Sequence, residues 1–121
     1  MRTAQHEKIN YVEFPAKDLS ASKAFFNSAF NWQFTDYGPE YSAFSANEAG
    51  LEGGFYSSDL AAETPSGSAL IVFYSKKLEE TQQKVTRCGG SVVKKIFSFP
   101  GGRRFHFTDP SGNEFAVWSD L

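Results

Sequence analysis

The sequence predicts an α+β fold in which two βαβββ modules form a single domain over residues 1–121. The first observation is a repeat: a strand pattern, a short Lys-containing segment and a helical pattern occur in each half of the chain. The second is that three more strand patterns follow each helical pattern, separated by turn-forming residues. These observations place the modules near residues 9–58 and 68–119, with a ligand site expected between them.

The first module is expected to begin with a strand at 9–14, because apolar and polar residues alternate there and put Tyr11 and Glu13 on one face. Asp18 suits the N-cap of an amphipathic helix that carries Phe26 on its apolar stripe and ends near Phe30. Further strands are predicted at 32–37, 41–46 and 51–57, with turns at 38–39 and 47–50.

The second module repeats this order. Its first strand, 68–74, places Leu70 and Val72 on one face. A helix at 78–88 carries Val85 on its apolar stripe and is followed by a glycine pair that suits a C-cap. The remaining strands are predicted at 91–97, 103–108 and 114–118. The segment 58–67 has no periodicity and is predicted to link the modules.

Composition and charge exclude several classes of function. A net charge of −2 and a pI near 5.6 provide no positive surface for nucleic acid. No apolar run approaches the roughly 20 residues that cross a bilayer, and the polar segment 1–8 lacks a signal-peptide core. The single cysteine, Cys88, permits no internal disulfide and is expected to be a small buried residue. We expect a cytoplasmic protein with neither a nucleic-acid nor a membrane partner.

Four segments, which span most of the chain, carry a family resemblance: 9–19, 25–32, 78–90 and 105–115. The most specific motif is the turn Asp-Pro-Ser-Gly-Asn at 109–113. The chain resembles the vicinal oxygen chelate superfamily, which includes glyoxalase I, bleomycin-resistance proteins and extradiol dioxygenases, and within it the small bacterial glyoxalase-related proteins. The resemblance implies two modules whose sheets curl into a half-open mixed β-barrel around a ligand cavity, usually in a homodimer.

The resemblance also implies where metal-dependent members hold their ion, namely on the first and last strands of each module. These positions correspond here to Tyr11, Leu70 and Ala116, with the fourth near Glu52. Leu70 and Ala116 have no side-chain donor, and one carboxylate with one phenol does not make a Zn²⁺ or Ni²⁺ site. We therefore expect no metal, no other cofactor and no lactoylglutathione lyase activity.

Strand alternation predicts which side chains line the cavity. On strand 103–108 the Phe side chains should pack against a helix, so that Arg104 and His106 face the cavity. The residues expected in one pocket are Tyr11, Glu13, Leu70, Val72, Arg104, His106, Glu114, Ala116 and Trp118. A different metal site that combines His106 with Glu13, Glu52 or Glu114 stays open, as does charge pairing of Glu13 with Arg104 or His106.

Three functions remain open at this point. The favoured one is metal-free binding of a small molecule between aromatic walls from Tyr11 and Trp118. The second is an isomerase, lyase or hydrolase of a small oxygenated substrate, with Glu13 or His106 as the general base. The third is a drug-sequestering resistance dimer, whose ligands are often cationic and for which a net charge of −2 gives little support. The residues do not identify the ligand.

Overall fold

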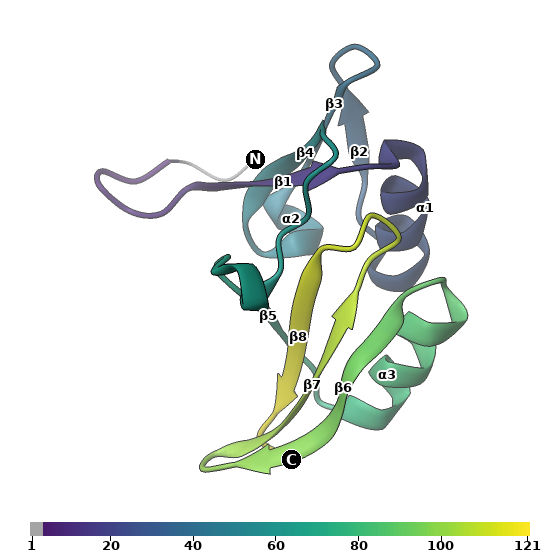
Figure 1. Ribbon diagram of the computed structural model, residues 1–121. Coiled ribbons are helices and arrows are strands. Elements are labelled where there is room, and N and C mark those ends of the chain that lie inside the picture. Colours follow the sequence, from purple (N-terminus) through teal and green to yellow (C-terminus); the bar gives the residue numbers. More distant parts are fainter. Residues whose placement is uncertain (1–3) are drawn as a thin grey trace.

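In the computed structural model, which describes residues 4–121, the chain forms two four-stranded sheets with two long helices, α1 and α3, on one side (Figure 1). The start of the predicted polar segment, residues 1–3, lies outside the described residues. The first half contains β1 (Tyr11–Ala16), α1 (Leu19–Phe30), β2 (Phe34–Asp36), β3 (Tyr41–Phe44), α2 (Ala46–Ala49) and β4 (Glu52–Ser57). The second half contains η1 (Thr64–Ser66), β5 (Ile71–Tyr74), α3 (Leu78–Arg87), β6 (Ser91–Phe99), β7 (Gly102–Thr108) and β8 (Glu114–Ser119).

The two halves have the same topology, which confirms the predicted pair of βαβββ modules and the α+β class. The strand orders are β1-β4-β3-β2 and β5-β8-β7-β6. In each sheet the first strand pairs with the last in parallel, and the other neighbours are antiparallel. Figure 1 shows the first sheet above the second, with α1 and α3 beside them on the right.

The helix ends follow local capping chemistry. The Asp18 side chain accepts a hydrogen bond from the Ala21 backbone N–H at 3.0 Å, as an N-cap should. Asn31 ends α1 in the left-handed conformation, with φ of 60°. Cys88 caps the end of α3 and is partly buried against the core. No helix within residues 4–121 combines the length and apolar character that a bilayer crossing requires.

Helix α1 packs against both sheets and joins the two modules. Phe26 is fully buried, and its ring centroid lies 5.5 Å from that of Phe55 on β4 and 5.3 Å from that of Phe115 on β8. Phe30 stacks on Phe73 of β5 at 4.5 Å. The side chains predicted to pack under the helices do so: Val12, Phe14, Ile71, Phe73, Phe26 and Val85 all belong to the core or pack against it.

The predicted turn at 109–113 also ties the modules together. The Asn113 side-chain amide donates to the Pro15 carbonyl at 2.6 Å. The Asp109 carboxylate accepts hydrogen bonds from the Ser22 hydroxyl and from the Ser111 and Asn113 backbone N–H groups, at 2.9 to 3.0 Å. Burial raises the pKa of Asp109, and these hydrogen bonds oppose that shift. The most specific sequence motif therefore has a structural role in this chain.

Some predicted boundaries are wrong, each for a local reason. The first strand begins at Tyr11, and Ile9 is 83% exposed with no strand beside it. The second strand, predicted to begin at residue 32, begins at Phe34, and the Trp32 ring before it packs in the core. The segment predicted as a turn at 47–50 belongs to helix α2. The Ser45 hydroxyl caps its start by accepting a hydrogen bond from the Asn47 backbone N–H, and Gly50 ends it in the left-handed conformation.

Candidate functional site

Most of the predicted site residues lie on the side of each sheet that faces away from the helices, which we call the outer face. Phe14, Phe105 and Phe107 are buried against the helix side, so their neighbours along the strand point outward. The outer face of the first sheet carries Tyr11, Glu13, Tyr41, Gly54 and Tyr56. That of the second sheet carries Val72, Tyr74, Arg104, His106, Glu114, Ala116 and Trp118.

On the first sheet a chain of hydrogen bonds ends on a carboxylate. Tyr41 donates its hydroxyl proton to Glu13 Oε2 at 2.9 Å, so the 2.6 Å contact between the two phenols is donated by Tyr11. Partial burial, together with the hydrogen bonds to Tyr11 and Glu13, raises the pKa of Tyr41 well above its usual range. The Tyr41 phenol therefore stays protonated at neutral pH and acts as a donor.

The sequence does not predict Tyr41 as a site residue. A side chain on Gly54 would collide with the Tyr41 hydroxyl, so the ring lies over β4 only because that position is glycine. The glycine pair inside a predicted strand was the available signal that a bulky side chain crosses there.

On the second sheet His106 and Glu114 form a buried pair. His106 Nδ1 lies 2.8 Å from Glu114 Oε2, and the two residues are 2% and 7% exposed. Glu114 Oε1 accepts bonds from the Thr64 backbone N–H and hydroxyl, both at 2.8 Å. Burial raises the pKa of Glu114, but the hydrogen bonds from His106 and Thr64 outweigh it and lower the pKa overall. The linker thus covers the end of the outer face where the histidine lies.

Beside this pair, aromatic side chains form a strip along the second sheet. The Arg104 guanidinium lies over the rings of Phe97 and Phe99, at 5.3 and 5.7 Å from their centroids. Trp118 packs edge-on against Tyr74 at 5.2 Å. Alternation does not predict Phe97 and Phe99 on this face, because β6 has two register shifts between 92 and 97 that change which side chains point outward.

Within residues 4–121 the residues predicted to share one pocket are divided between the two sheets. Tyr11 and Glu13 lie on the first sheet, whereas Arg104, His106 and Trp118 lie on the second. Across residues 4–121 no hydrogen bond, ion pair or ring contact joins the two sets. Of the predicted partners for Glu13, Arg104 contacts phenylalanines and His106 contacts Glu114. The charge pairing of Glu13 with Arg104 or His106 is therefore wrong for this chain.

A groove of about 320 Å³ lies beside Glu13. Tyr56 from β4 and Leu60 and Ala69 from the segment between the modules contribute to its walls. Among the described residues that line it, Glu13 is the one that carries a charge. The groove therefore combines mostly apolar walls with one charged group and the hydroxyl-bearing residues Tyr56 and Ser68, which is the usual make-up of a ligand site.

Comparison with protein families gives a match over residues 8–117 to the family described as the Glyoxalase/Bleomycin resistance protein/Dioxygenase superfamily. The chain belongs to this superfamily. The resemblance carried by the sequence segments is thereby confirmed. A comparison with curated proteins gave no match.

Solved structures show the same superfamily fold. FosX, a genomically encoded fosfomycin resistance protein from Listeria monocytogenes, has a TM-score of 0.76 at 19% identity, covering 95% of this chain and 94% of that one. A family enzyme from Burkholderia phytofirmans PsJN has a TM-score of 0.73 at 16% identity, covering 93% and 98%. TioX from Micromonospora sp. ML1 has a TM-score of 0.68 at 12% identity, covering 94% and 99%. At these identities the likeness shows the fold.

The metal positions implied for this superfamily do not fit an ion in this member. Leu70, which precedes β5, and Ala116, which is fully buried, have no donor atoms. The Tyr11 phenol bonds to Tyr41, and Glu52 accepts a bond from the Ala46 backbone N–H at 2.5 Å. Within the part of the chain that the structure describes, no three His, Cys, Asp or Glu residues cluster in a way that would hold a metal.

Proposed function

We propose that this superfamily member binds a small organic molecule on its outer faces, without a metal ion, in a homodimer whose second copy completes each site. The observation that carries the proposal is the exposure of large side chains on each of the two outer faces. Tyr11, Tyr56, Val72, Tyr74 and Phe97 are each between 37% and 48% exposed. Contiguous exposed apolar surface on a folded domain usually marks a place where a ligand or a partner binds.

The geometry supports binding rather than general-base catalysis by His106. That ring is only 2% exposed and bonded to Glu114, so it is not accessible to a substrate in this chain. On the first sheet the Glu13 carboxylate offers an acceptor beside the groove, and the Tyr41 hydroxyl holds it in place by donating to Oε2. These groups suit the orientation of a bound molecule by hydrogen bonds, with Tyr11 and Trp118 as the flat walls.

A thermal-shift screen tests this proposal. Ligand binding to the native state increases the free energy of unfolding by mass action, by about 2.7 kcal/mol at a hundredfold excess over Kd, and so raises the melting temperature. We expect at least one organic compound of a metabolite panel to raise it by several degrees, and Zn²⁺ or Ni²⁺ to leave it unchanged. Trp118→Ala and Tyr11→Ala should abolish the ligand shift, whereas Leu121→Ala, which removes an exposed side chain beyond β8, should not. Stabilisation by metal alone would contradict the proposal.

The expected dimer has its own measurement. β1 and β5 are both edge strands, and an open strand edge next to exposed aromatic residues favours pairing with a second copy. One chain has a mass of 13.4 kDa, and light scattering should give a particle of twice that mass. Val72→Asp, which places a charge on the exposed β5 edge, should shift the protein toward monomers. A wild-type mass of one chain at micromolar concentration would contradict the dimer.

A further inference from the structure

A second cavity is a cleft of about 500 Å³ between the two modules, and of the outer-face residues Val72 and Tyr74 contribute to its lining. Its floor contains the rings of Phe14, Phe30, Trp32, Phe44 and Phe73, which come from both modules. The rings pack closely, with centroids 4.5 Å apart for Phe30 and Phe73 and 4.3 Å apart for Trp32 and Phe44. A volume of this size falls within the range of roughly 300–1,000 Å³ typical of small-molecule sites.

Polar groups are confined to the rim of this cleft. On one side the Thr81 hydroxyl of α3 lies 2.7 Å from that of Ser75, and Lys84 follows one turn later on the helix. On the opposite side α2 contributes Asn47 and Glu48, both of which are exposed. The cleft therefore has a flat apolar floor and one cationic edge.

Lys84 is held against the floor without an acidic partner. Its ammonium nitrogen lies 5.5 Å from the centre of the Phe30 ring, and the residue is partly buried. Within residues 4–121 it forms no ion pair, and Glu48 on the far rim does not reach it.

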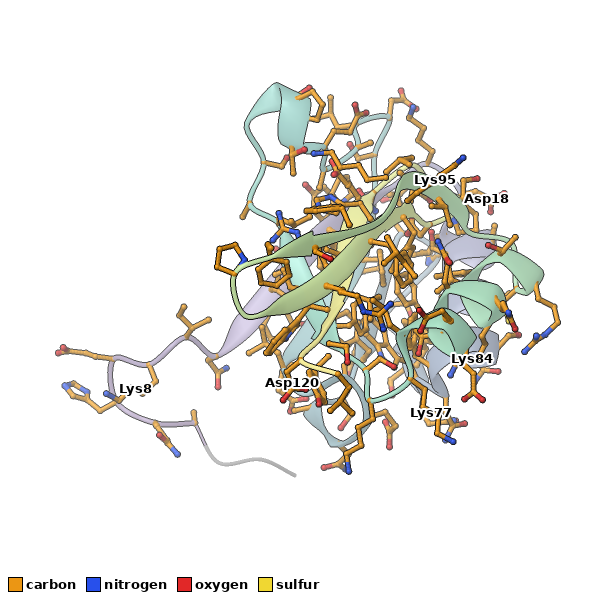
Figure 2. The ribbon with its side chains drawn as sticks, turned by 90° about the horizontal axis from the view of Figure 1, so that it is seen from below. Lys8, Asp18, Lys77, Lys84, Lys95 and Asp120 are labelled. Carbon is orange, nitrogen blue, oxygen red and sulfur yellow. The ribbon has the colours of Figure 1, made fainter. Side chains whose placement is uncertain are left out.

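The two carboxylates on the first turn of α3 bind elsewhere. Glu79 pairs with Arg103 of β7, and Glu80 lies 3.9 Å from Lys77 at the start of the helix (Figure 2 labels Lys77 and Lys84). An ammonium group that lies in a cleft and forms no ion pair within residues 4–121 is well placed to receive the anionic group of a ligand.

We propose that this cleft binds a flat aromatic carboxylate, with its ring on the aromatic floor and its carboxylate on Lys84 Nζ. The Ser75 and Thr81 hydroxyls lie along the same edge and provide hydrogen-bonding groups beside the anion. Tyr11, Glu13 and Trp118 do not line this cleft, although Val72 and Tyr74 of the outer face do. Among the residues predicted to bind a ligand, Val72 lines this cleft.

The probe is 2-naphthoate, with the neutral 2-naphthamide as its isostere. Titration followed by backbone amide shifts should move the signals of Ser75, Thr81 and Lys84. We expect Lys84→Met to weaken 2-naphthoate binding about tenfold or more and to leave 2-naphthamide binding unchanged, because only the charged contact is lost. Lys77→Met, on the same helix but outside the cleft, is the matched control and should bind both compounds as wild type does.

Filling the cleft provides an independent readout. Ala49→Leu enlarges a side chain in the wall of the cleft and should weaken the binding of both 2-naphthoate and 2-naphthamide. Thermal melting followed by circular dichroism checks that the variant folds. Equal 2-naphthoate affinity in wild type and Lys84→Met, shifts confined to the outer faces, or no binding at millimolar concentration would each overturn the assignment. Trp118→Ala should retain 2-naphthoate binding, so that failure of the outer-face proposal and failure of the cleft proposal are distinguishable.

Discussion

Phe26→Ala is expected to lower the free energy of unfolding by about 3–5 kcal/mol, the range for truncating a fully buried phenylalanine. Phe26 has no exposed surface and lies between α1, β4 and β8. Its ring contacts those of Phe25, Phe30, Trp32, Phe55 and Phe115. Because these rings belong to both modules, the cavity left by the substitution would weaken the packing within each module and the joint between them.

Urea unfolding measures this difference. Domains of this kind are stable by only about 5–15 kcal/mol, so the variant should unfold at a much lower urea concentration. Phe97→Ala is the matched control, because it removes the same side chain where the ring is 37% exposed, and it should cost about 1 kcal/mol or less. Similar midpoints for the two variants would show that α1 is not the joint between the modules.

The second large effect is expected from Glu114→Ala, at about 3 kcal/mol or more, because each buried donor left without its acceptor costs about 1–3 kcal/mol. The substitution leaves His106 Nδ1 and both Thr64 donors without their acceptor. Glu114→Gln keeps the shape and one acceptor oxygen, so it should cost less. An equal loss of stability in the two variants would show that the charge does not contribute.

Glu114 should also make the free energy of unfolding depend on pH. The pKa of Glu114 is lowered on folding from an ordinary value of 4.5, so its stabilising contribution is complete above that value. The contribution is lost as the pH falls through the lower pKa of the folded state. Asp109, whose pKa is raised on folding, contributes a pH dependence of stability with the opposite sign. This contribution is the same in wild type and in Glu114→Gln, so it cancels in their difference. The difference between wild type and Glu114→Gln, measured from about pH 6 to pH 3, should therefore shrink as the pH falls.

Part of the candidate site could be predicted from the sequence. Alternation along a strand is a local property with a period of two, so Tyr11 and Glu13 could be placed on one face of their strand, and Arg104 and His106 on one face of theirs, without knowledge of the packing. The prediction that all of them share one pocket needed the arrangement of the two sheets, which alternation does not give. The same reasoning correctly put His106 and Glu114 on a common face. It could not show that these two residues are covered, because the cover comes from a segment around Thr64 that has no sequence periodicity.

The sequence by itself determined the repeated order of strands and helices, the Asp18 cap and the turn at 109–113, because each depends on residues a few positions apart. The tertiary structure alone decided which surfaces are covered and where cavities open. The position of Tyr41 over Gly54, the burial of the His106 and Glu114 pair, and the cleft beneath Lys84 all depend on segments far apart in the chain. The first two depend on how strands and the linker pack within one module, and the cleft depends on helix α1 packing against both sheets, which no local pattern of residues encodes.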